Sequence, residues 1–333
     1  MPPKLVLAHG PERHELDMES GWTVQVFVDC DPGIDDALAL AYLAAQPEVR
    51  LVGVGTVYGN NAVDVTTDNA LRLLELYGAR DVPVAAGAGR PLVQPPSLAE
   101  SVHGRNGLGD VVTPGPQGTA VAESAAELLV RLVRSAPGEI DVLALGPLTN
   151  LALALGLEPE LPRLVRRLVV MGGAVQVPGN VTPWAEANVS NDPEAAEVVL
   201  GAGFDLTLVA LDVTMRTLAD AAWLDELAAV PGERAAMSAR FLDFYTGWYS
   251  RALGERACAM HDPLAAAILV DPALVTESAE VPVRVELRGE YTRGLTVADL
   301  RRWSPDSDSR PAVTLATEVN SAEFLKRMLN ALR

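Results

Sequence analysis

The chain has 333 residues, of which 49% are hydrophobic, so it is long enough to bury a large core. Its 44 acidic residues outnumber 26 basic ones and give a net charge of −18 at pH 7, which disfavours nucleic acid and anionic membranes as partners and favours a neutral substrate or a cation. No apolar run reaches the roughly 18 residues of a membrane span, and the N-terminus does not resemble a signal peptide. The two cysteines provide neither a disulfide framework nor a zinc site. We therefore expect a cytoplasmic protein.

Short β-branched runs alternate along the chain with longer segments of helical period, a pattern typical of an α/β fold. Most of these runs are continuously apolar, as buried parallel strands are. We therefore predict a single domain over residues 23–333, with a mostly parallel central sheet flanked by helices, after an N-terminal extension of residues 1–22. The predicted strands span residues 24–28, 51–57, 82–86, 141–145, 168–171, 205–211, 281–287 and 313–317, the predicted helices span 36–45, 63–77, 121–134, 193–200 and 321–332, and a long loop rich in Gly and Pro spans 87–118.

The stretch from residue 219 to 253 interrupts this alternation, because it is helical without an intervening strand. It ends in an aromatic group formed by Phe241, Phe244, Tyr245, Trp248 and Tyr249. We interpret residues 219–255 as a helical lid. The alternative, which we favour for Phe241 and Phe244, is that the rings belong to the core on one face of an amphipathic helix.

Polar side chains follow several of the predicted strands at the point where each strand ends. Ligands of open α/β sheets bind beyond the carboxyl ends of the strands, so these side chains are expected to converge on one cleft. They are Asn60 and Asn61 after the second strand, Thr149 and Asn150 after the strand at 141–145, and the pair His261 and Asp262 before a later apolar helix.

The densest polar group follows the first strand, where Asp29, Asp31, Asp35 and Asp36 lie within eight residues. Two like charges about 4 Å apart repel by about 4 kcal/mol at an effective dielectric of 20, and a helix N-terminus offsets only about 0.3–1 kcal/mol per anion. Carboxylates without a cluster of His or Cys favour a hard cation, calcium or magnesium, with Asp262 as a remote ligand. The alternative is that Asp35 and Asp36 only cap the next helix and that Asp29 pairs with a buried arginine.

The segment VDCDPGIDDALAL at residues 28–40 resembles the N-terminal signature of the inosine–uridine-preferring nucleoside hydrolase family. Six later blocks resemble those of the family in the same order, so the resemblance extends from about residue 24 to the C-terminus. The blocks are YGN (58–60), GPLTNLA (146–152), MGGA (171–174), GNVTPWAEANVSNDPEAA (179–196), HDPLAA (261–266) and TRGLTV (292–297).

The resemblance implies a calcium site and a set of substrate contacts. Calcium ligands are implied for the side chains of Asp31, Asp36 and Asp262 and for the backbone carbonyl of Leu145. Ribose contacts are implied for Asp35, Asn60, Asn180, Glu186 and Asn188, further substrate contacts for Met171, His103, Tyr245 and Tyr249, and a base-side role for His261. Independently, the hydroxyls of a ribose suit Asp, Asn and Glu partners, and a hard cation chelates a diol directly.

The implied reaction is the calcium-dependent hydrolysis of a ribonucleoside to ribose and free base, in nucleoside salvage. Breaking the N-glycosidic bond builds positive charge on the sugar, which surrounding carboxylates stabilise. Asp31 is the expected general base for the metal-bound water, and His261 is the expected partner of the leaving base. The resemblance also implies a homodimer or homotetramer.

Other readings and the base preference stay open at this point. Ala187 replaces an aromatic residue often found in relatives, and Arg105 and Asn106 follow His103 where acidic residues are commoner, so the choice between purine and pyrimidine is not predicted. A haloacid-dehalogenase-type phosphatase would use Asp29 as a nucleophile, but no basic phosphate clamp is evident. A histidine–aspartate phosphohydrolase would need an all-helical fold and several His ligands. A non-catalytic calcium-dependent nucleoside-binding protein is the alternative from a different class.

Overall fold

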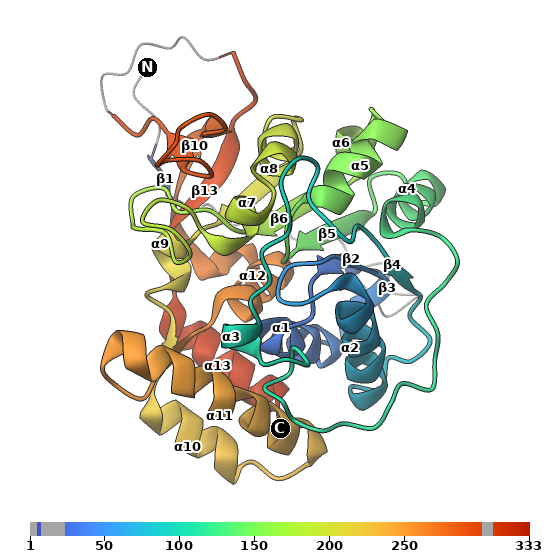
Figure 1. Ribbon diagram of the computed structural model, residues 1–333, viewed down its shortest axis with the longest axis vertical. Coiled ribbons are helices and arrows are strands. Elements are labelled where there is room, and N and C mark those ends of the chain that lie inside the picture. Colours follow the sequence, from blue (N-terminus) through green and yellow to red (C-terminus); the bar gives the residue numbers. More distant parts are fainter. Residues whose placement is uncertain (1–4, 8–23, 302–308) are drawn as a thin grey trace.

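A nine-stranded sheet forms the centre of the computed structural model, which describes residues 5–7, 24–301 and 309–333 (Figure 1). Its strands are β1 (Leu5–Leu7), β2 (Val24–Cys30), β3 (Val49–Thr56), β4 (Val84–Ala86), β5 (Ile140–Ala144), β6 (Arg167–Met171), β7 (Leu206–Val209), β10 (Val275–Val281) and β13 (Val313–Val319). Their order is β1-β10-β13-β7-β6-β5-β2-β3-β4. The strands from β13 to β4 are parallel, and β10 is antiparallel to β13. The predicted mostly parallel sheet is confirmed.

Helices cover both faces of this sheet (Figure 1). Along a strand, successive side chains point to opposite faces, so Val28 and Leu143 pack into one core and Phe27 and Val142 into the other. The first core lies under α1 (Ile34–Ala44), α2 (Val63–Leu76), α12 (His261–Val270) and α13 (Ser321–Ala331), and the second under α4 (Ala125–Ser135), α5 (Thr149–Leu157), α6 (Leu161–Leu164) and α8 (Pro193–Leu200). Among the described residues, no helix combines the length and apolarity needed to cross a membrane.

The chain reverses its direction of progress across the sheet between two neighbouring strands, β2 and β5. From β2 it builds outward through β3 to β4, and it then returns to place β5 on the other side of β2. The loops that leave β2 and β5 therefore diverge, and ligands of open α/β sheets bind at such a point, so we refer to the carboxyl ends of these strands as the crevice. Asp31 follows β2 and Leu145 follows β5, so both lie at this crevice.

The helical stretch predicted as a lid consists of α10 (Ala221–Ala229) and α11 (Glu233–Leu253). A short antiparallel pair, β8 (Leu218–Ala219) with β9 (Cys258–Ala259), closes its base, close to the two ends of the predicted range of about 219–255. Phe241 is fully buried, as the core interpretation predicted, and Phe244 is half-buried against the same core. Figure 1 shows α11 crossing beside α1 and the short helix α3 (Glu100–His103), which interrupts the predicted loop at 87–118.

Two predicted elements are wrong in their bounds. The strand predicted at 281–287 is divided at Pro282, which has no N–H to donate to a ladder, so β10 ends at Val281 and β11 (Val283–Val285) pairs instead with β12 (Thr296–Ala298). The helix predicted at 121–134 begins at Ala125, because Ser124 accepts a hydrogen bond from the backbone N–H of Glu127 and caps it.

The predicted N-terminal extension is described only at β1, which pairs with β10. The rest of residues 1–22 lies outside the described residues.

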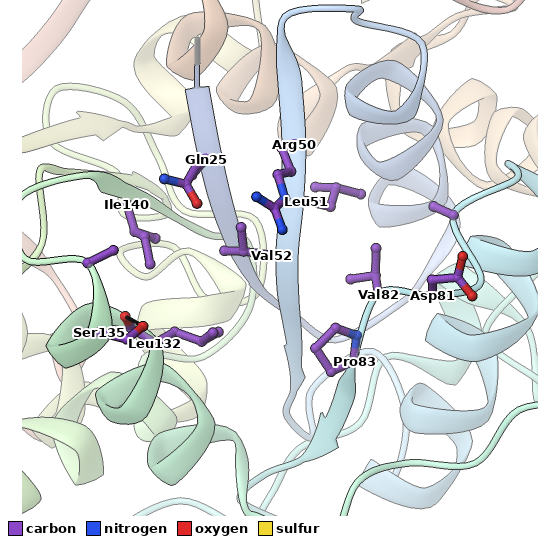
Figure 2. Close-up of a pocket in the computed structure, with 12 residues that line it drawn as sticks. Gln25, Arg50, Leu51, Val52, Asp81, Val82, Pro83, Leu132, Ser135 and Ile140 are labelled. Atoms are coloured by element: carbon purple, nitrogen blue, oxygen red, sulfur yellow. Dashed lines mark hydrogen bonds between the residues drawn. The ribbon is translucent and has the colours of Figure 1, made fainter. Parts of the chain in front are cut away.

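A cavity of about 410 Å³ opens at the end of the sheet opposite to the crevice (Figure 2). It is lined by Gln25, Arg50 and Ile140, which lie near the starts of β2, β3 and β5, and by Asp81 just before β4. Parallel strands bring their polar carboxyl-end residues to the other edge, so this cavity contains none of the predicted site residues.

The fold predicts a large cost for removing one buried carboxylate of β5. Asp141 is fully buried, and both Arg166 and Arg167 donate hydrogen bonds to it. Asp141→Ala leaves two half-buried guanidinium groups without their partner, so we expect the free energy of unfolding to fall by about 3 kcal/mol in a urea titration. The matched control is Glu160→Ala, which removes the exposed pair with Arg163 and should leave the midpoint unchanged. Equal effects of the two substitutions would contradict this account.

Candidate active site

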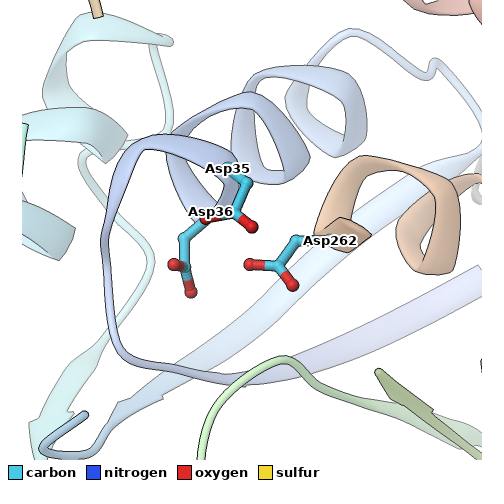
Figure 3. Close-up of side chains that lie close together, drawn as sticks. All are labelled: Asp35, Asp36 and Asp262. Carbon is cyan, nitrogen blue, oxygen red and sulfur yellow. The ribbon is translucent and has the colours of Figure 1, made fainter. Parts of the chain in front are cut away.

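Three carboxylates from two helix N-termini meet at the crevice (Figure 3). Asp35 and Asp36 lie in the first turn of α1, and Asp262 lies at the start of α12, which packs against α1. One oxygen from each of the three carboxylates lies within 4.8 Å of the other two, and all three side chains are buried. The structure thus brings together residues that are more than 220 positions apart in the sequence.

Asp31 joins this group through the turn that links β2 to α1. The Oδ2 atom of Asp31 accepts a hydrogen bond from the backbone N–H of Asn60 at 2.7 Å. Asp36 accepts hydrogen bonds from the backbone N–H of Asp31 at 3.2 Å, from that of Gly33 at 2.9 Å and from the Asn60 amide at 3.0 Å. Asp36 therefore caps α1, as the alternative interpretation had it, but this leaves Asp35 and Asp262 to be explained.

Asp29, by contrast, points away from the group. It is buried, and its Oδ1 atom accepts a hydrogen bond from the Asn150 amide at 2.7 Å, rather than from an arginine. Asn150, which follows β5, therefore holds the buried Asp29 carboxylate and is not one of the residues that meet at the carboxylate group. It also argues against the phosphatase reading, because a nucleophilic carboxylate has to be accessible to its substrate.

The electrostatics of the group call for a positive charge. Burial, followed by the charge of Asp35, raises the pKa of Asp36 to about 7. Burial likewise raises the pKa of Asp35, and it raises the pKa values of Asp31 and Asp262 well above the ordinary range. The Oδ1 atom of Asp35 is buried and has no hydrogen-bond partner among the described residues. A donor set made only of oxygen atoms, with one buried acceptor unused, fits a hard cation such as calcium or magnesium.

The opposite wall of the crevice follows β5 and β6. Asn188 donates hydrogen bonds to the carbonyl oxygens of Leu145 at 2.7 Å and Met171 at 3.2 Å. Glu186, which is buried, caps the short helix α7 (Ala187–Asn191) by accepting from the backbone N–H groups of Asn188 and Val189. These bonds hold the predicted ligand carbonyl of Leu145 next to the predicted ribose contacts Glu186 and Asn188.

Asn180 lies at the edge of this wall. Its side chain is exposed, and its Oδ1 atom accepts a hydrogen bond from the backbone N–H of Ala187 at 3.0 Å. Further along, Asp192 caps α8 by accepting a hydrogen bond from the backbone N–H of Ala195.

Tyrosines and histidines form a third wall, in which α11 meets α1 and α12. The Tyr245 hydroxyl donates to Asp35 Oδ2 at 3.2 Å, and the Tyr249 hydroxyl lies 2.6 Å from His261 Nε2. The ring of His103 lies 5.5 Å from that of Tyr245, centroid to centroid, and its Nδ1 lies 3.8 Å from Asp35 Oδ1. All five side chains are buried.

Both histidines of this wall are neutral at physiological pH. Burial lowers the pKa of His103 to about 3 and that of His261 to about 4. The backbone N–H of Ile34 donates to His103 Nδ1 at 3.1 Å, so the hydrogen of the neutral ring lies on Nε2. His103 is therefore a fixed hydrogen-bond donor beside the crevice.

One polar contact of this wall was not predicted from the sequence. Thr214 in the short helix α9 (Leu211–Thr214) is fully buried, and its Oγ1 atom lies 2.7 Å from His261 Nδ1. The rule that polar residues beyond the carboxyl ends of strands face the site could have found it, because α9 follows β7. Asn61, which was expected to face the cleft, donates a hydrogen bond to the backbone carbonyl of Arg105, in the loop that carries His103.

Comparisons with known proteins agree with this geometry. The family model described as "Inosine-uridine preferring nucleoside hydrolase" matches residues 26–326. The chain is 38% identical to a probable uridine nucleosidase of Arabidopsis thaliana, over 95% of this chain and 99% of the relative, and 38% identical to an inosine-uridine preferring nucleoside hydrolase of Crithidia fasciculata, over 92% and 97%. The solved structure of a plant nucleoside hydrolase is similar with a TM-score of 0.89 at 33% identity, covering 93% of this chain and 99% of that one.

The raised pKa of Asp36 predicts how pH acts on the metal-free protein. The folded state keeps a proton on Asp36 up to about pH 7, whereas the unfolded state loses it near 3.8, so the contribution of this carboxyl to stability declines as pH rises through about 7. In the presence of a chelator, Asp36→Asn should therefore become more stable relative to the wild type between pH 5 and pH 8. Urea midpoints at several pH values measure this. A difference that stays constant or moves in the opposite direction would contradict it, and added calcium should reverse the sign by stabilising only the wild type.

Proposed function

The chain belongs to the inosine-uridine preferring nucleoside hydrolase family, and we propose that it cleaves ribonucleosides with calcium held by the carboxylate group at the crevice. The enzyme is a nucleoside hydrolase, and it breaks the N-glycosidic bond to release ribose and free base. The observation that carries the calcium proposal is the convergence of buried carboxylates with raised pKa values on one all-oxygen site.

The residues that would hold the ion are Asp31, Asp36, Asp262 and the carbonyl of Leu145. These groups supply only oxygen atoms, which calcium prefers. When bound, the cation supplies positive charge that offsets the buried carboxylates and polarises the water and hydroxyl groups that it contacts.

Ribose recognition is assigned to the two walls that flank the carboxylates. Asp35 offers a buried oxygen without a hydrogen-bond partner, which suits a ribose hydroxyl donor. Asn60 approaches from β3, and Asn180, Glu186 and Asn188 approach from the segment after β6. The Asn188 amide also donates to the sulfur of Met171 at 3.7 Å, and Met171 is assigned as a further substrate contact. The set is dense in groups that bond hydroxyls and contains no cationic residue for a phosphate.

Asp31 is the proposed general base for the attacking water. One of its oxygens is held by the N–H of Asn60, which fixes the carboxylate and leaves the other oxygen for the water. As the bond to the base lengthens, positive charge develops on the ribose, and the carboxylates around it stabilise the oxocarbenium-like transition state.

The leaving base is assigned to the third wall. His261 lies on this side, with Tyr249 on its Nε2 atom, and Tyr245 and His103 complete the surface. His103 presents an N–H, which suits a base with a carbonyl oxygen or a ring nitrogen. Both purines and pyrimidines carry such acceptors, so the proposal covers both. We further propose that the protein acts in nucleoside salvage in the cytoplasm and that it assembles as a homodimer or homotetramer.

A direct assay tests the activity and its metal dependence. Inosine, uridine, cytidine and adenosine are each incubated with the protein, and reducing sugar is measured with and without a calcium chelator. We expect ribose from at least one nucleoside, loss of turnover with the chelator, and recovery on adding calcium. Hydrolysis of a phosphate ester without ribose release would contradict the proposal.

Replacing the proposed base tests the mechanism separately. Asp31→Asn keeps the size of the side chain but cannot accept the proton of water, so we expect kcat to fall by about 10²- to 10⁴-fold. The control is Asp68→Asn, which changes an exposed carboxylate of α2 and should leave kcat unchanged. Full turnover by Asp31→Asn would rule out the general-base role alone.

A further inference from the structure

Buried polar side chains extend from α9 to the rings of α11. Thr214 Oγ1 lies 2.7 Å from His261 Nδ1, and His261 Nε2 lies 2.6 Å from the Tyr249 hydroxyl. The Tyr249 ring packs against that of Tyr245, with centroids 4.8 Å apart, and the Tyr245 hydroxyl donates to Asp35 at 3.2 Å. All of these side chains are buried, so a donor among them needs an acceptor within the site.

The two contacts of His261 depend on which ring nitrogen carries the hydrogen, because a neutral imidazole has one N–H and one acceptor nitrogen. With the hydrogen on Nε2, His261 donates to the Tyr249 hydroxyl, so the hydrogen of Tyr249 stays free for another acceptor. In that tautomer Nδ1 is an acceptor, and Thr214 donates to it.

Thr214 decides between the two tautomers. It is fully buried, and among the described residues its hydroxyl is hydrogen-bonded only to His261 Nδ1. A buried O–H without an acceptor is costly, whereas a hydroxyl oxygen that accepts nothing costs less. The hydroxyl of Thr214 therefore donates to Nδ1, and the hydrogen of His261 lies on Nε2.

We propose that Thr214 is a positioning residue, which holds the hydrogen of His261 on Nε2 and so makes Tyr249 a hydrogen-bond donor toward the departing base. This inference rests on the proposed function, because it concerns the leaving group of that reaction. No proton is transferred in this role: the Tyr249 O–H stabilises negative charge that develops on the base. In the opposite tautomer, Tyr249 would give its hydrogen to His261 and turn its lone pairs to the base, which repels the same charge.

The tautomer of His261 is measured first. The chain has four histidines, so a nitrogen-15 NMR spectrum of the imidazole rings is simple, and the signals of His261 are assigned by their loss in His261→Gln. We expect the Nε2–H form for His261 in the ligand-free, calcium-loaded protein. A predominant Nδ1–H form overturns the proposal, and this readout does not depend on activity.

Kinetics then test the effect on the leaving group. Thr214→Val keeps the shape but removes the hydroxyl, so we expect kcat on uridine or inosine to fall by about 10- to 100-fold with KM within about twofold. A 4-nitrophenyl riboside, whose leaving group needs no hydrogen-bond donor, should keep its kcat, and Thr214→Ser should restore turnover of the nucleosides. Equal losses on both kinds of substrate, or no recovery in Thr214→Ser, overturn the proposal.

A double variant separates this role from a general structural one. If Thr214 acts through Tyr249, then Thr214→Val combined with Tyr249→Phe should lose no more turnover than Tyr249→Phe alone. Additive losses overturn the proposal. If the wild type cleaves neither nucleosides nor the nitrophenyl riboside, the proposed function fails, whereas the tautomer of His261 still decides whether Thr214 orients the ring.

Discussion

The mutual repulsion of buried carboxylates at the crevice is the constraint on which the rest of the site depends. Asp31, Asp35, Asp36 and Asp262 are brought together where the loops that leave β2 and β5 diverge, and burial raises the pKa of each. Protonation or a cation is the only way to relieve such a cluster, and a hard cation does so while keeping the carboxylates ionised for the reaction. The same negative charge that costs stability in the empty site stabilises the positive charge that forms on a ribose. In the proposed mechanism, stability and catalysis therefore depend on one ion.

The surrounding structure holds these carboxylates in place. Backbone N–H groups of the β2–α1 turn and of Asn60 fix Asp31 and Asp36, and the capping of α7 by Glu186 fixes Asn188 against Leu145. The buried rings of α11 form the third side, and their low polarizability to charge relative to water strengthens the electrostatic interactions beside them. In this arrangement, Tyr245 bonds the carboxylate of Asp35 that we assign to the ribose, so a bound sugar has to compete with α11 for that oxygen.

Sequence patterns predicted the features that depend on local chemistry and failed where distant contacts decide. The parallel strands were all predicted to within two residues at each end, because buried strands are continuous apolar runs. The carboxylate group was predicted from the crowding of charge after β2. Pro282 divides a run that looked continuous, and β8 and β9 are too short to leave a pattern. The bond from Tyr245 to Asp35 spans 210 residues and the contact between Thr214 and His261 spans 47, so only the folded chain reveals these contacts.

The central claim, that the buried carboxylates form one hard-cation site, is tested most directly by titrating calcium into metal-free protein in a calorimeter. The account predicts saturable binding of one ion per chain, tighter in the presence of ribose, and weakened at least about tenfold by Asp262→Asn, since each lost ligand removes a charge from the site. Absence of binding to the wild type, or binding to Asp262→Asn with unchanged affinity, would contradict it.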